Sequence, residues 1–207
     1  YMVDGKELFS DIHQHFSERN ITIIKDSIIK VQSQDQRWHL VGRENYDDFD
    51  QVVLAMGRGT HEWFPDLHLT LQGGSLVQVT PNNLKSVPAL SLDGLHVGQH
   101  KSGDWVIGST RWNTPPTETH TETLSLIQKL KCTLPNAPQM NTSSATVWSG
   151  IRTIFPTDRM PLCGRLPQHN NIFVVTALGS KGWLWGPWAS FHLARLMNQP
   201  HHTIPPS

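Results

Sequence analysis

Two segments in the last third of the chain have residue types and spacing suited to binding a ligand. The first, Gly150-Ile151-Arg152, reads as an arginine held beside a pocket. The second is the glycine-bracketed turn Gly179–Gly182, which follows the β-branched run at 172–175 and precedes a helical sequence. A strand that runs into a helix leaves backbone N–H groups unpaired at the helix start, where they can receive an anion or an electron-rich ring edge. This pattern favours a bound cofactor over simple core packing.

These segments resemble the FAD-dependent oxidoreductases of the D-amino acid oxidase and glycine oxidase family, and the likeness extends through most of the chain. Within that family, Gly150-Ile151-Arg152 and the turn at 177–182 are similar to the oxidase domain of the bifunctional tRNA 5-methylaminomethyl-2-thiouridine biosynthesis enzyme. The resemblance implies FAD as the cofactor. It also implies an α/β (α+β) fold, part of a two-domain architecture of glutathione-reductase-like type, with a mixed antiparallel sheet in the substrate domain.

The resemblance further implies a reaction. An amino acid or secondary amine that carries a carboxylate would be oxidised at its C–N bond by hydride transfer to the flavin, and the imine would then be hydrolysed. A small amino acid, an N-methyl amino acid and a carboxymethylaminomethyl group on a tRNA wobble uridine all present an amine beside a carboxylate. The sequence leaves these substrates open.

Arg152 is implied by the resemblance to hold the substrate carboxylate, and it is the single catalytic candidate. A guanidinium suits that task because its planar, permanently charged fork can donate two parallel hydrogen bonds. The alternative is an ordinary salt bridge at a strand edge. For Asp158 and Arg159, a solvated turn with local ion pairing is favoured over a role in catalysis.

The turn before the last helix is implied to contact the flavin through its backbone N–H groups. Negative charge accumulates on the pyrimidine edge of the reduced ring, so a helix N-terminus there stabilises it. Lys181 would add a positive charge, although a surface lysine is the alternative. The implied cofactor-binding residues of this turn are Gly179, Ser180, Lys181, Gly182, Trp183 and Leu184.

Further candidates lie elsewhere in the chain. Ile28 and the strand end at Ala55 and Gly57 match positions where the family packs the adenosine half of FAD; a core isoleucine and plain turn geometry are the alternatives. His96 and Trp183 are predicted to contact the substrate, whereas Trp188 is predicted to pack in the core. No spacing of metal ligands indicates a metal site.

These candidates need strands and helices to position them, and periodicity predicts several. Helices are predicted from Glu7 to about residue 19 and over 118–130. Alternating and β-branched runs predict strands at 21–24, 27–31, 37–41, 50–57, 73–79, 95–98, 105–110 and 172–175.

The predicted organisation follows from these elements and from the resemblance. Residues 1–60 are predicted to be part of the FAD-binding domain, and residues 61–147 the substrate domain, an antiparallel sheet with a helix. Residues 148–200 are predicted to return to the FAD-binding domain with the flavin-contacting turn and a C-terminal helix. A tail follows at 201–207.

The glycine-rich dinucleotide fingerprint expected after the first strand of such a flavoprotein does not occur in this sequence. Gly57-Arg58-Gly59 is a lone fragment of it. We therefore expect the chain to be a C-terminal portion in which the N-terminal dinucleotide-binding βαβ unit is missing, with another chain segment completing the FAD site. The alternative is a non-catalytic binding module without FAD.

Composition limits the partners. The formal net charge is zero and 16% of residues are charged, so a tRNA partner would need a local basic patch, to which Lys101, Arg111 and Lys181 could contribute. Cys132 and Cys163 are far apart, which favours two reduced, buried thiols in a cytoplasmic protein. No apolar run is long enough to predict a membrane span.

Overall fold

The chain forms two compact units in the computed structural model. The first unit comprises Tyr1–Ile24 and Gly73–Ile151, and the second comprises Lys25–Gln72 and Arg152–Ser207. Which unit binds a cofactor and which binds a substrate stays a prediction, as do the domain boundaries placed after residues 60 and 147. The predicted tail at 201–207 lies outside the described residues. The structure describes residues 5–34, 37–83, 86, 89–112, 119–167, 169 and 171–198.

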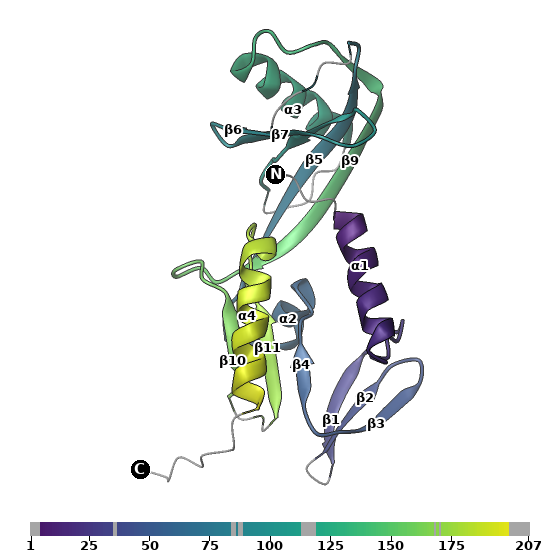
Figure 1. The fold of residues 1–207 in the computed structure, drawn as a ribbon. Coiled ribbons are helices and arrows are strands. Elements are labelled where there is room, and N and C mark those ends of the chain that lie inside the picture. The colour runs from purple at the N-terminus through teal and green to yellow at the C-terminus, as the bar shows by residue number, and fades with distance from the viewer. Residues whose placement is uncertain are drawn as a thin grey trace. The chain divides into compact units, whose positions relative to one another are not determined.

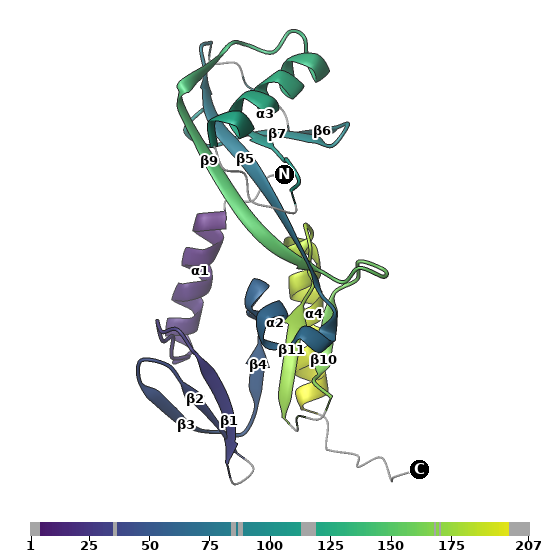
Figure 2. The ribbon, with the colours of Figure 1, turned by 180° about the vertical axis from the view of Figure 1, so that it is seen from behind.

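The first unit is built on a five-stranded sheet with the strand order β6-β7-β8-β5-β9. Strands β5, β6, β7 and β8 pair antiparallel, and in Figure 2 the long strands β5 and β9 run side by side. The prediction of an antiparallel sheet in this region is confirmed. Its strands are β5 (Thr70–Pro81), β6 (Leu90–Leu92), β7 (Leu95–Gln99), β8 (Trp105–Gly108) and β9 (Met140–Ile154).

Helix α3 (Thr119–Thr133) covers one face of this sheet, because Leu126 and Leu130 pack with inward-facing strand residues such as Val77 and Ile107. Side chains alternate between the two faces of a strand, so the neighbours of these buried residues lie on the other face. Helix α1 (Gly5–Glu18) also belongs to this unit. It half-buries a stripe of apolar residues spaced four apart, namely Leu8, Ile12 and Phe16.

The second unit contains two three-stranded sheets (Figure 1). Strands β1 (Lys30–Gln34), β2 (Arg37–Val41) and β3 (Asn45–Phe49) form an antiparallel sheet. In the other sheet, the central strand β11 pairs antiparallel with β10 and parallel with β4. The remaining elements are β4 (Val52–Leu54), α2 (Arg58–Trp63), η1 (Pro65–Leu67), β10 (Leu162–Arg165), β11 (Ile172–Thr176) and α4 (Gly182–Met197).

Helix α4 packs one side on β10 and β11, as Figure 1 shows, and buries Ala189 and Leu193 against Phe173. Its other residues include four large apolar side chains that are each about half exposed or more: Trp183, Leu184, Trp188 and Phe191. The prediction that Trp188 packs in the core is therefore wrong, since its side chain is 48% exposed. Along the described part of the chain, no helix combines the length and apolar character needed to cross a membrane.

Two further predictions need correction. No strand forms at 21–24, and Ile21, Ile23 and Ile24 are about half exposed; β-branched residues favour a strand only where a neighbouring strand can accept their backbone hydrogen bonds. Cys132 is exposed and not buried. Cys163 is half-buried and donates to the carbonyl of Ala189, and burial raises the pKa of its thiol.

The turn between β2 and β3 depends on a close approach at Gly42. The Asp26 carboxylate accepts hydrogen bonds from the Arg43 N–H at 2.9 Å and the Tyr46 hydroxyl at 2.9 Å, and a Cβ at Gly42 would overlap it. Gly42→Ala is therefore expected to lower the free energy of unfolding by about 1–3 kcal/mol. Urea denaturation measures this, with Gly164→Ala as the control, because a Cβ there meets nothing within 4 Å. An equal change in both variants would contradict the expectation.

A second expected result concerns Asp104, which closes the β7–β8 hairpin. Hydrogen bonds from Gln78, Ser102 and Thr80 hold the pKa of Asp104 below its usual value of 3.8. A lowered pKa in the folded state stabilises the protein above the unfolded value, and this contribution is lost as the pH falls through the folded pKa. We expect Asp104→Asn to cost about 1 kcal/mol at pH 7. Urea denaturation of both proteins should show the difference shrinking below about pH 3.8, and a difference independent of pH would contradict this.

Candidate active site

Arg152 lies near the C-terminal end of β9 and is half-buried. Its Nη2 donates a hydrogen bond to Oε1 of Gln72 at 3.1 Å. Gln72 belongs to β5, the neighbour of β9 in the sheet, and both residues fall in the second unit. An amide oxygen orients a guanidinium without neutralising its charge.

The next residue along β9 joins this strand to the turn before α4. Thr153 is 4% exposed, and its carbonyl accepts the Gly179 N–H at 3.2 Å. Its hydroxyl bonds the hydroxyl of Thr176 at 3.1 Å and accepts the Ala177 N–H at 3.3 Å. Strand β9, which carries Arg152, and the turn before α4 are therefore hydrogen-bonded directly to each other, although they are distant in sequence.

The turn itself leads into the N-terminus of helix α4. Gly179 adopts a φ of +56°, where a Cβ would lie 3.4 Å from Cγ2 of Ile154. Lys181 is the N-cap residue of α4, and its carbonyl accepts the N–H groups of Leu184 and Trp185. Within the described residues, the backbone N–H groups of Ser180 and Gly182 have no acceptor. Two donors thus remain at the positive end of the helix.

The predicted turn residues differ in their exposure. Gly179 and Gly182 are half-buried, whereas Ser180, Lys181, Trp183 and Leu184 are exposed. Trp183 is 57% exposed and Leu184 is 67% exposed, so the first turn of α4 presents a large apolar surface beside the two N–H donors. Planar organic groups bind well to such a combination of backbone donors and apolar surface.

The end of β4 reaches the same edge of the sheet as this turn. Strands β4 and β11 are parallel neighbours, with Leu54 opposite Val174. The residues that follow the two strands therefore leave the sheet at the same edge, where open α/β sheets bind their ligands. Ala55 and Gly57 are exposed there, and a Cβ at Gly57 would meet nothing within 4 Å. Ile28 is half-buried in the extended segment before β1.

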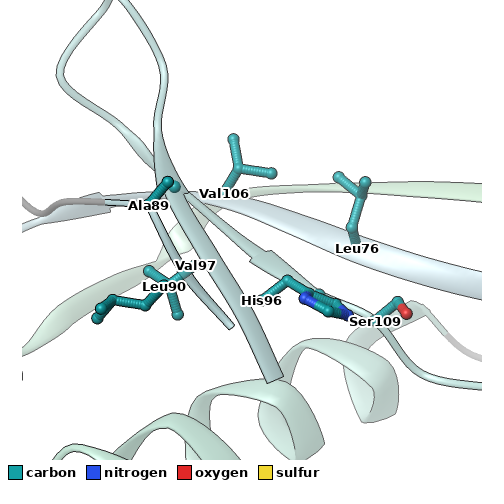
Figure 3. A pocket seen from close by; sticks show the side chains of 9 residues that line it. Leu76, Ala89, Leu90, His96, Val97, Val106 and Ser109 are labelled. Carbon is teal, nitrogen blue, oxygen red and sulfur yellow. The ribbon is translucent and has the colours of Figure 1, made fainter. Parts of the chain in front are cut away.

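His96 lies in the first unit, beside a pocket of about 320 Å³ on its sheet. Figure 3 shows the His96 ring and the Ser109 side chain on one side of the pocket and Ala89 and Leu90 on the other. The other lining side chains are mainly apolar. His96 was predicted from the sequence but the pocket was not, although the alternation of side chains along β5, β7 and β8 is a signal for it.

The remaining candidates have local structural roles. Asp158 Oδ1 accepts the Met160 N–H at 2.8 Å and Arg159 is exposed, consistent with a solvated turn. Lys101 forms an ion pair with Glu7 at 2.9 Å, and Arg111 is exposed. Among the residues described by the structure, no group of three or more His, Cys, Asp or Glu side chains could hold a metal ion.

Comparison with known proteins extends these observations. The model of a protein family described as FAD dependent oxidoreductase matches residues 2–196. The structure is similar to iminodiacetate oxidase from Chelativorans sp. BNC1, with a TM-score of 0.77 and 20% identity over 97% of this chain and 56% of that chain. It is also similar to glycine oxidase from Geobacillus kaustophilus, with a TM-score of 0.66 and 19% identity over 86% of this chain and 49% of that one.

An FAD-bound, dithionite-reduced L-α-glycerophosphate oxidase from Mycoplasma pneumoniae gives a TM-score of 0.71 at 16% identity, over 92% of this chain and 55% of that chain. The chain therefore spans about half the length of the proteins it matches. The shared fold confirms the predicted mixed α/β class with an antiparallel sheet.

Proposed function

The chain belongs to the family of FAD-dependent oxidoreductases, and we propose that the intact protein oxidises the C–N bond of a small amine or amino acid that carries a carboxylate. The observation that carries this proposal is the direct attachment of the Arg152 strand to the turn before α4, through Thr153 and Gly179. These hydrogen bonds link the strand that carries the Arg152 guanidinium to the N-terminus of helix α4. Both groups bind negative charge, and both the carboxylate of the substrate and the reduced flavin carry negative charge.

The residues of the second unit fit FAD. The N–H groups of Ser180 and Gly182, which have no acceptor among the described residues, would receive the electron-rich edge of the flavin ring. The open space beside Gly57 would admit a part of the cofactor that approaches the backbone closely. Ala55 lies at the same sheet edge, and Ile28 is proposed to contact the adenosine half. FAD would supply a two-electron acceptor for the hydride that leaves the substrate carbon.

Arg152 is proposed to bind the substrate carboxylate, with Gln72 fixing the plane of its guanidinium. Lys181 would add a second positive charge at the start of α4, where it favours electron-rich groups on the flavin. His96 and Trp183 are proposed to contact the remainder of the substrate. Such an active site needs little acid–base machinery, because its residues mainly orient a neutral amine and exclude water.

The structural neighbours support a small substrate of this kind. Their names include iminodiacetate oxidase and glycine oxidase, enzymes whose named substrates combine an amine with a carboxylate. A carboxymethylaminomethyl group on a tRNA wobble uridine has the same chemistry and is the second candidate. It would require a basic surface; of the candidate residues, Lys101 is paired with Glu7, whereas Arg111 and Lys181 are exposed. The small-molecule substrate is favoured by the named substrates of the neighbours.

An absorbance spectrum of the intact protein tests the proposed function. We expect the two flavin bands, and we expect them to bleach when glycine, sarcosine or iminodiacetate is added without oxygen. Bleaching by none of these amines, together with RNA binding that weakens steeply with salt, would shift the assignment to the tRNA substrate. A colourless protein that does not bind added FAD would refute the proposal.

Gly179 provides a variant that separates cofactor binding from folding. Its φ of +56° disfavours a β-branched residue, and a Cβ at this position already lies 3.4 Å from Cγ2 of Ile154. Gly179→Val is expected to weaken FAD binding at least about tenfold, because the turn must shift to relieve about 1–3 kcal/mol of strain. Fluorescence titration with FAD measures this. Gly164→Ala is the control, and unchanged affinity in the Gly179 variant would exclude the turn from the FAD site.

A further inference from the structure

A second pocket lies at the C-terminal end of helix α3, within the first unit. Its volume is about 290 Å³. Trp105, which lines it, belongs to the core cluster that contains Leu126 and Leu130 of α3, so the pocket lies on the α3 side of the sheet. The lining comes mainly from β6, β8 and the loop that follows α3: Ser86, Leu90, Trp105, Leu134, Pro135, Asn136, Ala137 and Pro138.

Hydrogen bonds hold the loop that forms one wall of this pocket. The Ala137 N–H donates to the Leu134 carbonyl at 2.9 Å, which closes a turn directly after α3. The Gln139 carbonyl accepts the Asn82 N–H at 2.8 Å, so the end of the loop is attached to the residue that follows β5. The two prolines of the loop restrict its backbone further, because each ring fixes φ near about −65°. The pocket is therefore preformed, as most small-molecule sites are.

The lining is uncharged. None of the eight described residues that line the pocket is Asp, Glu, Lys, Arg or His. Leu90, Trp105 and the two prolines supply apolar surface. The Ser86 hydroxyl and the Asn136 amide have no hydrogen-bond partner among the described residues, and both groups can donate and accept. A charged ligand group would lose its hydration in this pocket without gaining an opposite charge, which favours a neutral ligand.

The volume limits the size of such a ligand. An apolar cavity of about 150 Å³ can hold benzene, and the pockets that take drug-sized molecules begin at about 300 Å³. A pocket of about 290 Å³ therefore suits one aromatic or aliphatic ring with a short polar substituent. The ring can pack against the indole of Trp105 and the proline rings, which are rigid apolar surfaces.

We infer that this pocket is a second ligand site, which binds a neutral molecule with one ring and one amide or hydroxyl group. The ring lies against Trp105, and the polar group bonds to Ser86 and Asn136. This ligand differs in charge from the carboxylate-bearing amine of the proposed function. The inference therefore goes beyond that function and does not depend on it.

Binding is tested with phenylacetamide and phenylacetate, which differ only in the amide and the carboxylate. Methyl NMR of the intact protein should show phenylacetamide shifting the signals of Leu134 and Ala137, with a Kd of about 10 mM or below. At the same two signals phenylacetate should bind at least about tenfold more weakly, because its charge has no partner there. Leu90 also lines the pocket beside His96, so its signal alone is not diagnostic. Equal affinity, or shifts confined to other methyl groups, would overturn the inference.

Variants of the loop provide the second test. Ala137→Phe should weaken phenylacetamide binding at least about tenfold, because the new ring occupies the space of the ligand. Leu124→Phe is the matched control, since Leu124 is a 48% exposed residue of α3 outside the lining. Asn136 is exposed, so Asn136→Ala remains informative if Ala137→Phe does not fold, and it should weaken binding about 3- to 10-fold through the lost hydrogen bond. Unchanged affinity in either folded variant would refute the site.

Turnover of sarcosine distinguishes this second site from the site of the proposed function. Ala137→Phe should leave kcat/KM for sarcosine within about twofold, and phenylacetamide should not compete with sarcosine. Competitive inhibition that Ala137→Phe relieves would place the pocket in the active site and overturn its assignment as a second site. Absence of sarcosine oxidation in the wild-type protein would count against the proposed function, whereas phenylacetamide binding at Leu134 and Ala137 would still support the second site.

Discussion

Replacing Arg152 with alanine is expected to lower kcat/KM for a carboxylate-bearing amine by about 30- to 1,000-fold while FAD stays bound. Removing a hydrogen-bonded charge from a ligand carboxylate costs about 2–4 kcal/mol, and each 1.36 kcal/mol corresponds to about tenfold in rate. The flavin should stay because the proposed cofactor contacts lie in the turn at 179–184 and not on the arginine side chain. Steady-state kinetics and the flavin absorbance of the purified variant measure the two effects.

Two controls make the Arg152 result specific. Arg159→Ala removes an exposed arginine from the nearby turn and should leave kcat/KM within about twofold. Arg152→Lys keeps the charge but not the planar fork, so it should recover only part of the activity. Gln72→Ala should raise KM modestly, since it removes only the hydrogen bond that orients the guanidinium. Loss of flavin from Arg152→Ala, or unchanged kinetics, would contradict the assigned role.

The largest effect on stability is expected at Phe173. Its side chain is completely buried in β11, where it packs against Ala189 and Leu193 of α4, and the Arg165 guanidinium lies 5.4 Å from the ring centroid. Phe173→Ala should lower the free energy of unfolding by about 3–5 kcal/mol, because it removes buried apolar area and leaves a cavity between helix and sheet. Urea denaturation monitored by circular dichroism measures the change.

Phe191→Ala is the matched control for Phe173. Phe191 lies on the same helix α4, but its side chain is 61% exposed, so its loss should cost less than about 1 kcal/mol. Because α4 begins at the proposed flavin-contacting turn, Phe173→Ala should also weaken FAD binding, whereas Phe191→Ala should weaken it only if the cofactor or another surface covers that face. Equal destabilisation by the two variants would show that α4 does not pack on β11 as described.

Local sequence patterns predicted much of the secondary structure. The alternation at 73–79 and 95–98 produced strands, and the segment at 118–130 produced a helix that ends within a few residues of the prediction. These patterns succeed because backbone preference and side-chain alternation are properties of neighbouring residues. The run Ile21–Ile24 had the same preference and formed no strand in the structure, since a strand also requires a partner that local sequence does not specify.

The candidate site shows the same division. Resemblance to a family indicated Arg152 and the turn at 179–184, whereas His96 was predicted from its position on a strand; the functional roles of all three remain predictions. Gln72 and Thr153 were not predicted from the sequence. Neither lies in a recognisable motif, and each contacts a residue that is distant in the sequence. Likewise Trp188 has the composition of a core residue, yet α4 turns that side of its surface outward.

The sequence by itself determined the family, the antiparallel sheet and the residues with suitable chemistry, because these depend on residue type and short spacing. Only the tertiary structure decided which of them meet. Register between β4 and β11 brings Gly57 to the edge occupied by the turn before α4, and register across β5, β7 and β8 aligns Gly98 and Gly108 beside larger side chains. Register is set by hydrogen bonds and packing between distant segments. A shift of one residue in the strand pairing would therefore remove the pocket beside His96 without changing the backbone preference of any residue.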